Sequence, residues 1–257
     1  MSLIIEKPRQ YRRRALLITL VAMIIVYILW NVPDLRVVLY PLNLFVTYIH
    51  EAGHSLAALL TGGQVVGFVV SADGSGLART IGGNSAVILP AGYLGAALFG
   101  SLLFYLINRF ARYARYIAFG LGLFILIFTI LFARPDETGA PVAIFVGAIF
   151  GALLAFSGLR GPNLLNMLVL NVLAITTALE AFFDLWFLTR VAGTASRGAV
   201  FNDAAQFAQQ YAPLLGPSII AFTWAGIALV MFSIALWYGA IRPFREEIND
   251  AYNTLRR

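Results

Sequence analysis

The sequence contains no cysteine and only two histidines among its 257 residues. The absence of cysteine excludes disulfide bonds and metal sites ligated by thiolates, and it leaves the redox compartment of the protein undetermined. Both histidines fall in one short segment, FVTYIHEAGHSLAALL (residues 45–60), which is otherwise typical of an apolar helix.

Charged residues are also scarce. They make up 12% of the chain, whereas hydrophobic residues make up 60% and the mean hydropathy is +0.84. A water-soluble domain cannot cover so much apolar surface with so few charges, so the composition places the chain in a lipid bilayer. We expect no nucleic-acid partner despite the net charge of +6, because the basic residues stand at the ends of the hydrophobic segments, where they anchor helices.

The hydrophobic residues form runs long enough to cross a bilayer, which takes roughly 20 apolar residues per helix. The first run is interpreted as an uncleaved helix rather than a signal peptide, because it is long and lacks a small-residue cleavage site. We predict an all-α polytopic membrane protein with about seven transmembrane helices, at residues 15–32, 42–60, 84–107, 116–133, 140–159, 163–188 and within 218–241.

The chain is expected to have three parts: a basic N-terminal segment (1–14), a transmembrane domain (15–241) and a polar C-terminal tail (242–257). In a seven-span arrangement, lysine and arginine are evenly divided between the two sides of the membrane. The dense basic cluster before the first helix favours a cytoplasmic N-terminus, since the first helix usually dominates orientation. We therefore expect an integral protein of the cell membrane with a cytoplasmic N-terminus.

The two histidines flank a glutamate in the sequence HEAGH (50–54). Residues four apart lie on the same face of a helix, so His50 and His54 can point at one ion, with Glu51 beside them. This is the HExxH zinc pattern, in which the metal lowers the pKa of a bound water and the glutamate accepts its proton. The alternative is a polar helix contact or a proton pathway, against which stands the cost of roughly 3 kcal/mol for an intramembrane glutamate.

Three stretches resemble the site-2 protease family of intramembrane zinc metalloproteases: HEAGHSLAALLTGG (50–63), the strand-like segment after it, and PAGYLGAALFG (90–100). The likeness is greatest to the compact, single-domain branch. It implies a polytopic helical core, Zn²⁺ bound by His50 and His54, Glu51 as the general base, and a membrane-anchored protein or peptide as the substrate.

Residues 64–70 and 77–81 flank the sequence SADGSG and predict a short β-hairpin between the second and third helices. One interpretation is an exposed strand edge that holds an extended substrate by main-chain pairing. The other is a plain connection between helices. The sequence leaves both open.

A hydrolytic zinc site normally has three protein ligands, so one ligand is missing from HEAGH. The resemblance implies an aspartate on a later helix, usually followed by glycine. The only Asp-Gly pair, Asp73-Gly74, comes too early in the chain. Asp184 is the preferred candidate, because Asp184 and His54 lie equally far from the ends of helices that run in the same direction.

Asp203, in FNDAAQF, is the alternative third ligand. It resembles an Asp-Ala element of the compact branch, and it also suits the first turn of a helix. Water or Glu180 could fill the place instead. Glu180 shares a helix face with Asp184. If it is not a ligand, it is expected to hydrogen-bond to a ligand or to exchange a proton with Asp184. Among the remaining residues, Gly147 and Gly151 predict a close helix contact, and Asn171 predicts a hydrogen bond between helices.

The leading hypothesis is an intramembrane zinc endopeptidase. A transporter in which His50, Glu51, Glu180 and Asp184 relay protons is one alternative, although no inverted repeat supports it. A protease-like membrane scaffold without activity is the other, because the later Asp-Gly pair is absent. No loop is long enough for a substrate-filtering domain, so selection rests on the membrane core, the hairpin or partner proteins.

Overall fold

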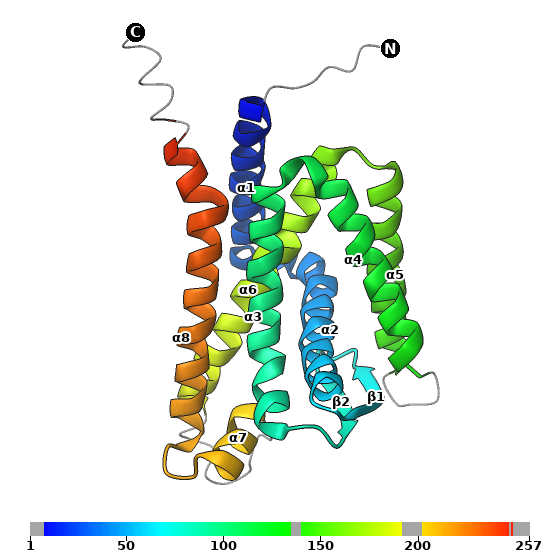
Figure 1. Ribbon diagram of the computed structural model, residues 1–257, viewed down its shortest axis with the longest axis vertical. Helices are drawn as coiled ribbons and strands as arrows, with labels where there is room; N and C mark the ends of the chain where they lie inside the picture. Colours follow the sequence, from blue (N-terminus) through cyan, green and yellow to red (C-terminus); the bar gives the residue numbers. More distant parts are fainter. Residues whose placement is uncertain (1–7, 135–139, 192–201, 247, 249–257) are drawn as a thin grey trace.

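The computed structural model describes residues 8–134, 140–191, 202–246 and 248 (Figure 1). Parts of the predicted N-terminal segment and C-terminal tail, residues 1–7 and 249–257, lie outside this range. Short helical turns follow α1, α3 and α8, at Pro33–Leu35, Ala111–Tyr113 and Trp237–Ile241. The other elements are α1 (Pro8–Asn31), α2 (Arg36–Leu60), β1 (Gln64–Val70), β2 (Gly76–Ile81), α3 (Ser85–Arg109), α4 (Ala114–Phe132), α5 (Ala140–Arg160), α6 (Asn163–Val191), α7 (Asp203–Tyr211) and α8 (Gly216–Leu236).

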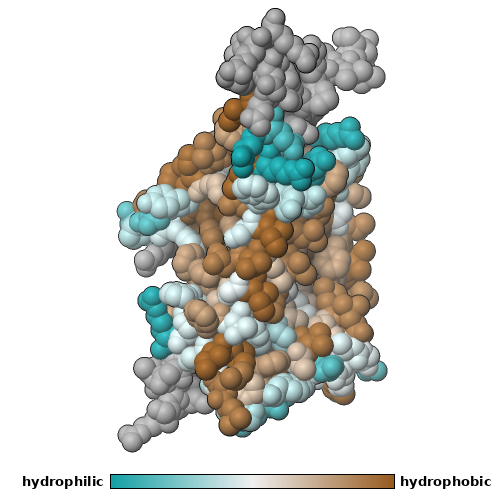
Figure 2. Space-filling view, turned by 60° about the vertical axis from the view of Figure 1, so that its left-hand side comes forward, coloured by the Kyte–Doolittle hydropathy of each residue, from teal (hydrophilic) through white to brown (hydrophobic). Residues whose placement is uncertain are grey.

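Six of the described helices are long and apolar enough to cross a membrane: α1, α3, α4, α5, α6 and α8. The face shown in Figure 2 is mostly hydrophobic in its middle, and hydrophilic residues gather towards its two ends. A polytopic, all-α membrane protein is therefore confirmed. The predicted second span (42–60) is helical, within α2, but it is not one of these six, because its polar residues dilute its apolar ones.

The start of α1 and the end of α8 lie at one end of the molecule, and the hairpin and α7 lie at the other (Figure 1). Because α1 begins at the first end and α2 leads into the hairpin, α1 and α2 together carry the chain across only once. The predicted seven-span arrangement put the start of the first helix and the end of the last helix on opposite sides of the membrane. The structure corrects this, because it places both at the same end of the molecule.

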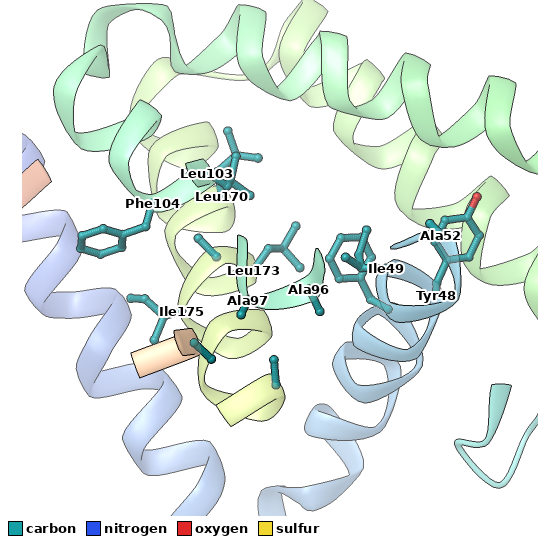
Figure 3. Close-up of a cluster of buried hydrophobic side chains, with 14 of the residues drawn as sticks. Tyr48, Ile49, Ala52, Ala96, Ala97, Leu103, Phe104, Leu170, Leu173 and Ile175 are labelled. Carbon is teal, nitrogen blue, oxygen red and sulfur yellow. The ribbon is translucent and has the colours of Figure 1, made fainter. Parts of the chain in front are cut away.

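The core at the centre of the bundle joins α2, α3 and α6 (Figure 3). Gly100 of α3 lets the helix approach α6 closely, since a Cβ at this position would overlap the backbone of Ala174 and Ala178. The cluster includes Tyr48, Ile49 and Ala52 of α2, Ala96, Ala97, Leu103 and Phe104 of α3, and Leu170, Leu173 and Ile175 of α6.

Buried amides connect the helices in this apolar setting. Asn108 of α3 donates to the side-chain oxygen of Asn171 on α6 at 2.9 Å, and Thr19 of α1 donates to Asn108. The expected role of Asn171 in a helix contact agrees with this chain of bonds. Gly147 and Gly151 lie against Thr129 and Leu126, as the predicted close contact of these small residues requires.

The predicted hairpin is present, with β1 and β2 paired antiparallel. Its tip is held against α2, because Tyr40 donates to the carbonyl of Ala72 at 2.7 Å and Thr47 donates to the carbonyl of Gly74 at 2.8 Å. The hairpin is thus fixed over the same helix that carries the HEAGH sequence.

Candidate metal centre

α2 places His50 and His54 one turn apart, with their Nε2 atoms 3.1 Å from each other. Nδ1 of His54 lies 2.7 Å from the carbonyl oxygen of Ile88, which can only accept. The Nδ1–H therefore donates, and Nε2 keeps its lone pair for another partner. The ring of His50 packs edge-on against Tyr93, with centroids 4.4 Å apart. Both rings are thereby oriented towards one point.

Asp203 brings a carboxylate to this point from outside the membrane-crossing helices. Its Oδ2 lies 3.3 Å from Nε2 of His50 and 3.3 Å from Nε2 of His54. Asp203 is the first residue of α7, and the side chain of Asn202 caps this helix by accepting a hydrogen bond from the N–H of Ala205 at 2.9 Å. The cap fixes where α7 begins and hence where Asp203 lies.

These three atoms have the spacing of ligands around a tetrahedral metal ion. Zinc bonds of about 2.0 Å at the tetrahedral angle put neighbouring ligand atoms about 3.3 Å apart. Two imidazole lone pairs and a carboxylate oxygen also repel one another at such distances unless a proton or a metal ion lies between them. Within the described part of the chain, His50, His54 and Asp203 form the group of three or more potential ligands that could hold a metal.

The carboxyl of Asp203 is in the form that binds a cation. Burial by itself raises the pKa of this group, but hydrogen bonds with His50 and His54 and their charges outweigh burial. The pKa of Asp203 is therefore held well below its usual range, and the side chain is ionised at neutral pH. Metal ligands must be deprotonated, and Asp203 meets this requirement; a bound metal would take the place of the protons that the two histidines share with it.

Glu51 lies beside the histidines with 6% of its surface exposed. The hairpin covers it: the backbone of Ala78 interacts with its carboxylate, and Gly76 lies so close that a Cβ there would overlap the carboxylate. Strand β2 is thus in direct contact with the glutamate of the HEAGH sequence.

Gly92 of α3 lies against the two histidines. A Cβ at this position would overlap Nε2 of both His50 and His54. In the same way, a Cβ at Gly53 would overlap the carbonyl of Ala91, so bare backbone lets α2 and α3 meet beside the site. No role at the site was predicted for Gly92 from the sequence, although it lies in PAGYLGAALFG (90–100), a signal that could have located it there.

A cavity of about 680 Å³ opens over these residues. It is lined by parts of α2, the hairpin, α3, α6 and α7, so it lies where the crossing helices meet the two short elements at one end of the molecule. Its polar lining includes Asn202, Gln206 and Gln210 as well as the group of potential metal ligands.

The two candidates for the third ligand are separated by the structure. Asp203 joins His50 and His54, whereas Asp184 lines the same cavity without belonging to the described metal-binding group. The equal depth inferred for Asp184 and His54 agrees with their common cavity. Depth alone does not bring the carboxylate of Asp184 to the histidines.

The other acids have structural partners. Glu180 accepts a hydrogen bond from the indole N–H of Trp30 at 3.1 Å and is not among the described residues that line the cavity. Asp73 accepts hydrogen bonds from the N–H and the hydroxyl of Ser75, at 3.0 and 2.7 Å, and so stabilises the hairpin turn. The Asp-Gly pair is therefore part of a turn.

A comparison with family models now adds to this geometry. The model described as Peptidase M50B-like matches residues 17–239. The chain belongs to this family. The resemblance of the chain to the site-2 protease family is thereby confirmed, and at the family level the protein is a site-2-type membrane metalloprotease. Comparisons with curated proteins and with solved structures give no match.

Proposed function

We propose that the protein is a zinc-dependent endopeptidase that hydrolyses peptide bonds of membrane-anchored proteins. The observation that carries the proposal is the spacing of 3.1 and 3.3 Å among the ligand atoms of His50, His54 and Asp203. In this proposal Asp203 is the third ligand. A bound Zn²⁺ would polarise the substrate carbonyl and activate a water. Glu51, buried beside the ligands, accepts the proton of that water as the general base.

The hairpin gives a reason why the substrate is a peptide. Within the described residues β2 pairs only with β1, so its other edge has no strand partner and is available apart from Ala78, which contacts Glu51. Gly76, Leu77, Ala78 and Thr80 line the cavity. A helix shields its peptide bonds, so a substrate segment must be extended before it is cleaved. The available edge of β2 can hold such a segment by main-chain hydrogen bonds, which supports the first interpretation of the hairpin.

We propose that the protein lies in the cell membrane and that one end of the molecule faces the cytoplasm. This is the end that holds the start of α1 and the last residues of α8. The opposite end carries few basic residues, among them Arg79, Arg134 and Arg190. The positive-inside rule then assigns the richer end to the cytoplasm, and the cavity opens near the opposite face. The richer end carries, among the described side chains, Arg14, Arg109, Arg112, Arg115, Arg160, Arg242 and Arg245.

The test of the proposal begins with the metal. We expect the purified protein to contain about one zinc per chain. Replacing both His50 and His54 with alanine, or Asp203 with asparagine, should remove most of it, because each change deletes a ligand. Elemental analysis of the purified variants measures this. Full zinc retention in the double histidine variant would contradict the site.

The second half of the test separates the metal from the chemistry. Glu51→Gln should keep zinc but abolish cleavage of a membrane-anchored substrate, because an amide cannot accept the proton of the water. Cleavage is followed by electrophoresis of the substrate in detergent micelles. Near-normal cleavage by this variant would reject Glu51 as the base, and loss of zinc would make Glu51 a structural residue of the site.

A further inference from the structure

Asp184 lies in the wall of the cavity without a role in the proposed zinc chemistry. Its side chain is exposed in the structure and lines the same space as Glu51 and the three ligands. No hydrogen bond or ion pair between side chains of the described residues involves Asp184, although it is close enough to His50 for an electrostatic interaction. It is an acid without a matched donor, beside the place where the reaction would occur.

The charges of the cavity are not balanced when a divalent cation is bound. The carboxylates of Glu51 and Asp203 together would offset the charge of a bound Zn²⁺. The negative charge of Asp184 then has no positive partner. No lysine or arginine is present among the described residues that line the cavity. Because Asp184 is exposed to the cavity, a positively charged group that enters the cavity with a substrate can meet its carboxylate.

We propose that Asp184 selects substrates with a lysine or arginine close to the scissile bond. This inference rests on the proposed peptidase function and names the substrate class of the same site. Ala181 and Leu188, about one turn before and after Asp184, also line the cavity. They provide apolar surface for the methylene stem of a long basic side chain, while Asp184 receives its charged end.

The experiment compares peptides that differ at one position. Each set carries lysine, norleucine or glutamate at the same place near the cleaved bond. The wild-type protein should cleave the lysine peptide about tenfold faster than the norleucine peptide in kcat/KM, the size expected for one hydrogen bond to a charged group. Asp184→Asn should remove this preference, and Asp184→Lys should reverse it towards glutamate. Glu180→Gln, one turn away and outside the described lining, is the matched control and should keep the preference.

Binding to a variant that cannot cleave gives a second readout. Fluorescence anisotropy of labelled peptides on Glu51→Gln should show tighter binding of the lysine peptide, and addition of Asp184→Asn should abolish the difference. If this holds while the wild-type protein cleaves nothing, the peptidase proposal fails and the binding role of Asp184 stands. Equal treatment of lysine, norleucine and glutamate peptides by the wild-type protein, at every position tried, would overturn the inference. Loss of zinc in Asp184→Asn would also overturn it, because Asp184 would then be a ligand.

Discussion

At the scale of single residues, the absence of a side chain at Gly92 is as important to the site as the ligands. A Cβ there would overlap Nε2 of His50 and of His54. The backbone of α3 cannot shift freely to relieve this overlap, because α3 packs against α6 at Gly100 and against α2 at Gly53. One methyl group would therefore displace the nitrogen atoms that face the proposed metal site.

We predict that Gly92→Ala folds but binds zinc at least about tenfold more weakly, since a displaced ligand commonly costs that much affinity or more. Zinc affinity is measured by competition with a chelator. Gly95→Ala is the matched control, because a Cβ at Gly95 meets only ordinary contact, with Cα of Gly53 at 3.4 Å. Normal zinc affinity in Gly92→Ala would show that the site relaxes around the methyl group.

The helical spacing of HEAGH was enough to predict that His50 and His54 face one point and that Glu51 lies beside them. It was not enough to rank the acids. Depth within a helix follows from counting residues, and this reasoning placed Asp184 in the cavity. The approach of Asp203 depends on how the chain turns back after α6 and on where α7 is capped. The cap at Asn202 is a local signal, whereas the placement of α7 against α2 is a long-range feature with no local pattern in the sequence.

At the scale of elements, α7 is the part of the site that needs the most support. It has nine residues, and helices this short are marginal on their own. Its end is tied to the start of α3 by the hydroxyls of Ser85 and Tyr211, which lie 2.6 Å apart, and Phe207 packs edge-on against Trp224 of α8 at 5.4 Å. These contacts hold Asp203, at the start of the same helix, in place.

We predict that Tyr211→Phe weakens zinc binding about fivefold, because the loss of one hydrogen bond of about 1 kcal/mol lets α7 move away from α3. Ser85→Ala should have the same effect, and the double variant should lose no more than either single one. Chelator competition measures all three. Tyr105→Phe, at a tyrosine of α3 that is outside the described hydrogen bonds, should leave affinity unchanged. Additive losses in the double variant would contradict the shared contact.

The helices and the hairpin could largely be predicted, because their apolar runs and turn residues are local signals. The hairpin strands differ from the expected 64–70 and 77–81 by one residue. The span count was less secure, since α2 combines an apolar length with polar residues that serve the site. A helix that holds a metal-binding group inside a bundle does not have the composition of one that faces lipid.

At the scale of the whole molecule, the span count decides the orientation. With seven spans, basic residues were equally divided between the two sides. When α1 and α2 carry the chain across once, the arginines from the end of α3 to the start of α4 move to the same side as the start of α1. They are Arg109, Arg112 and Arg115. The end of α8 joins them there. This uneven division supports the proposed cytoplasmic N-terminus, for a reason that sequence counting could not supply.

This orientation predicts which connections a reagent can reach from outside the cell, and the cysteine-free chain allows a direct test. Leu214, between α7 and α8, is 98% exposed, and Tyr113, between α3 and α4, is 41% exposed at the opposite end. Leu214→Cys should react with a membrane-impermeant maleimide in intact cells, because the end with α7 faces away from the cytoplasm in the proposed orientation. Tyr113→Cys should react only after the membrane is permeabilised, and both variants should react equally in detergent. The reverse pattern would place the cavity at the cytoplasmic face and show that the arginines around α3 and α8 do not set the orientation of this protein.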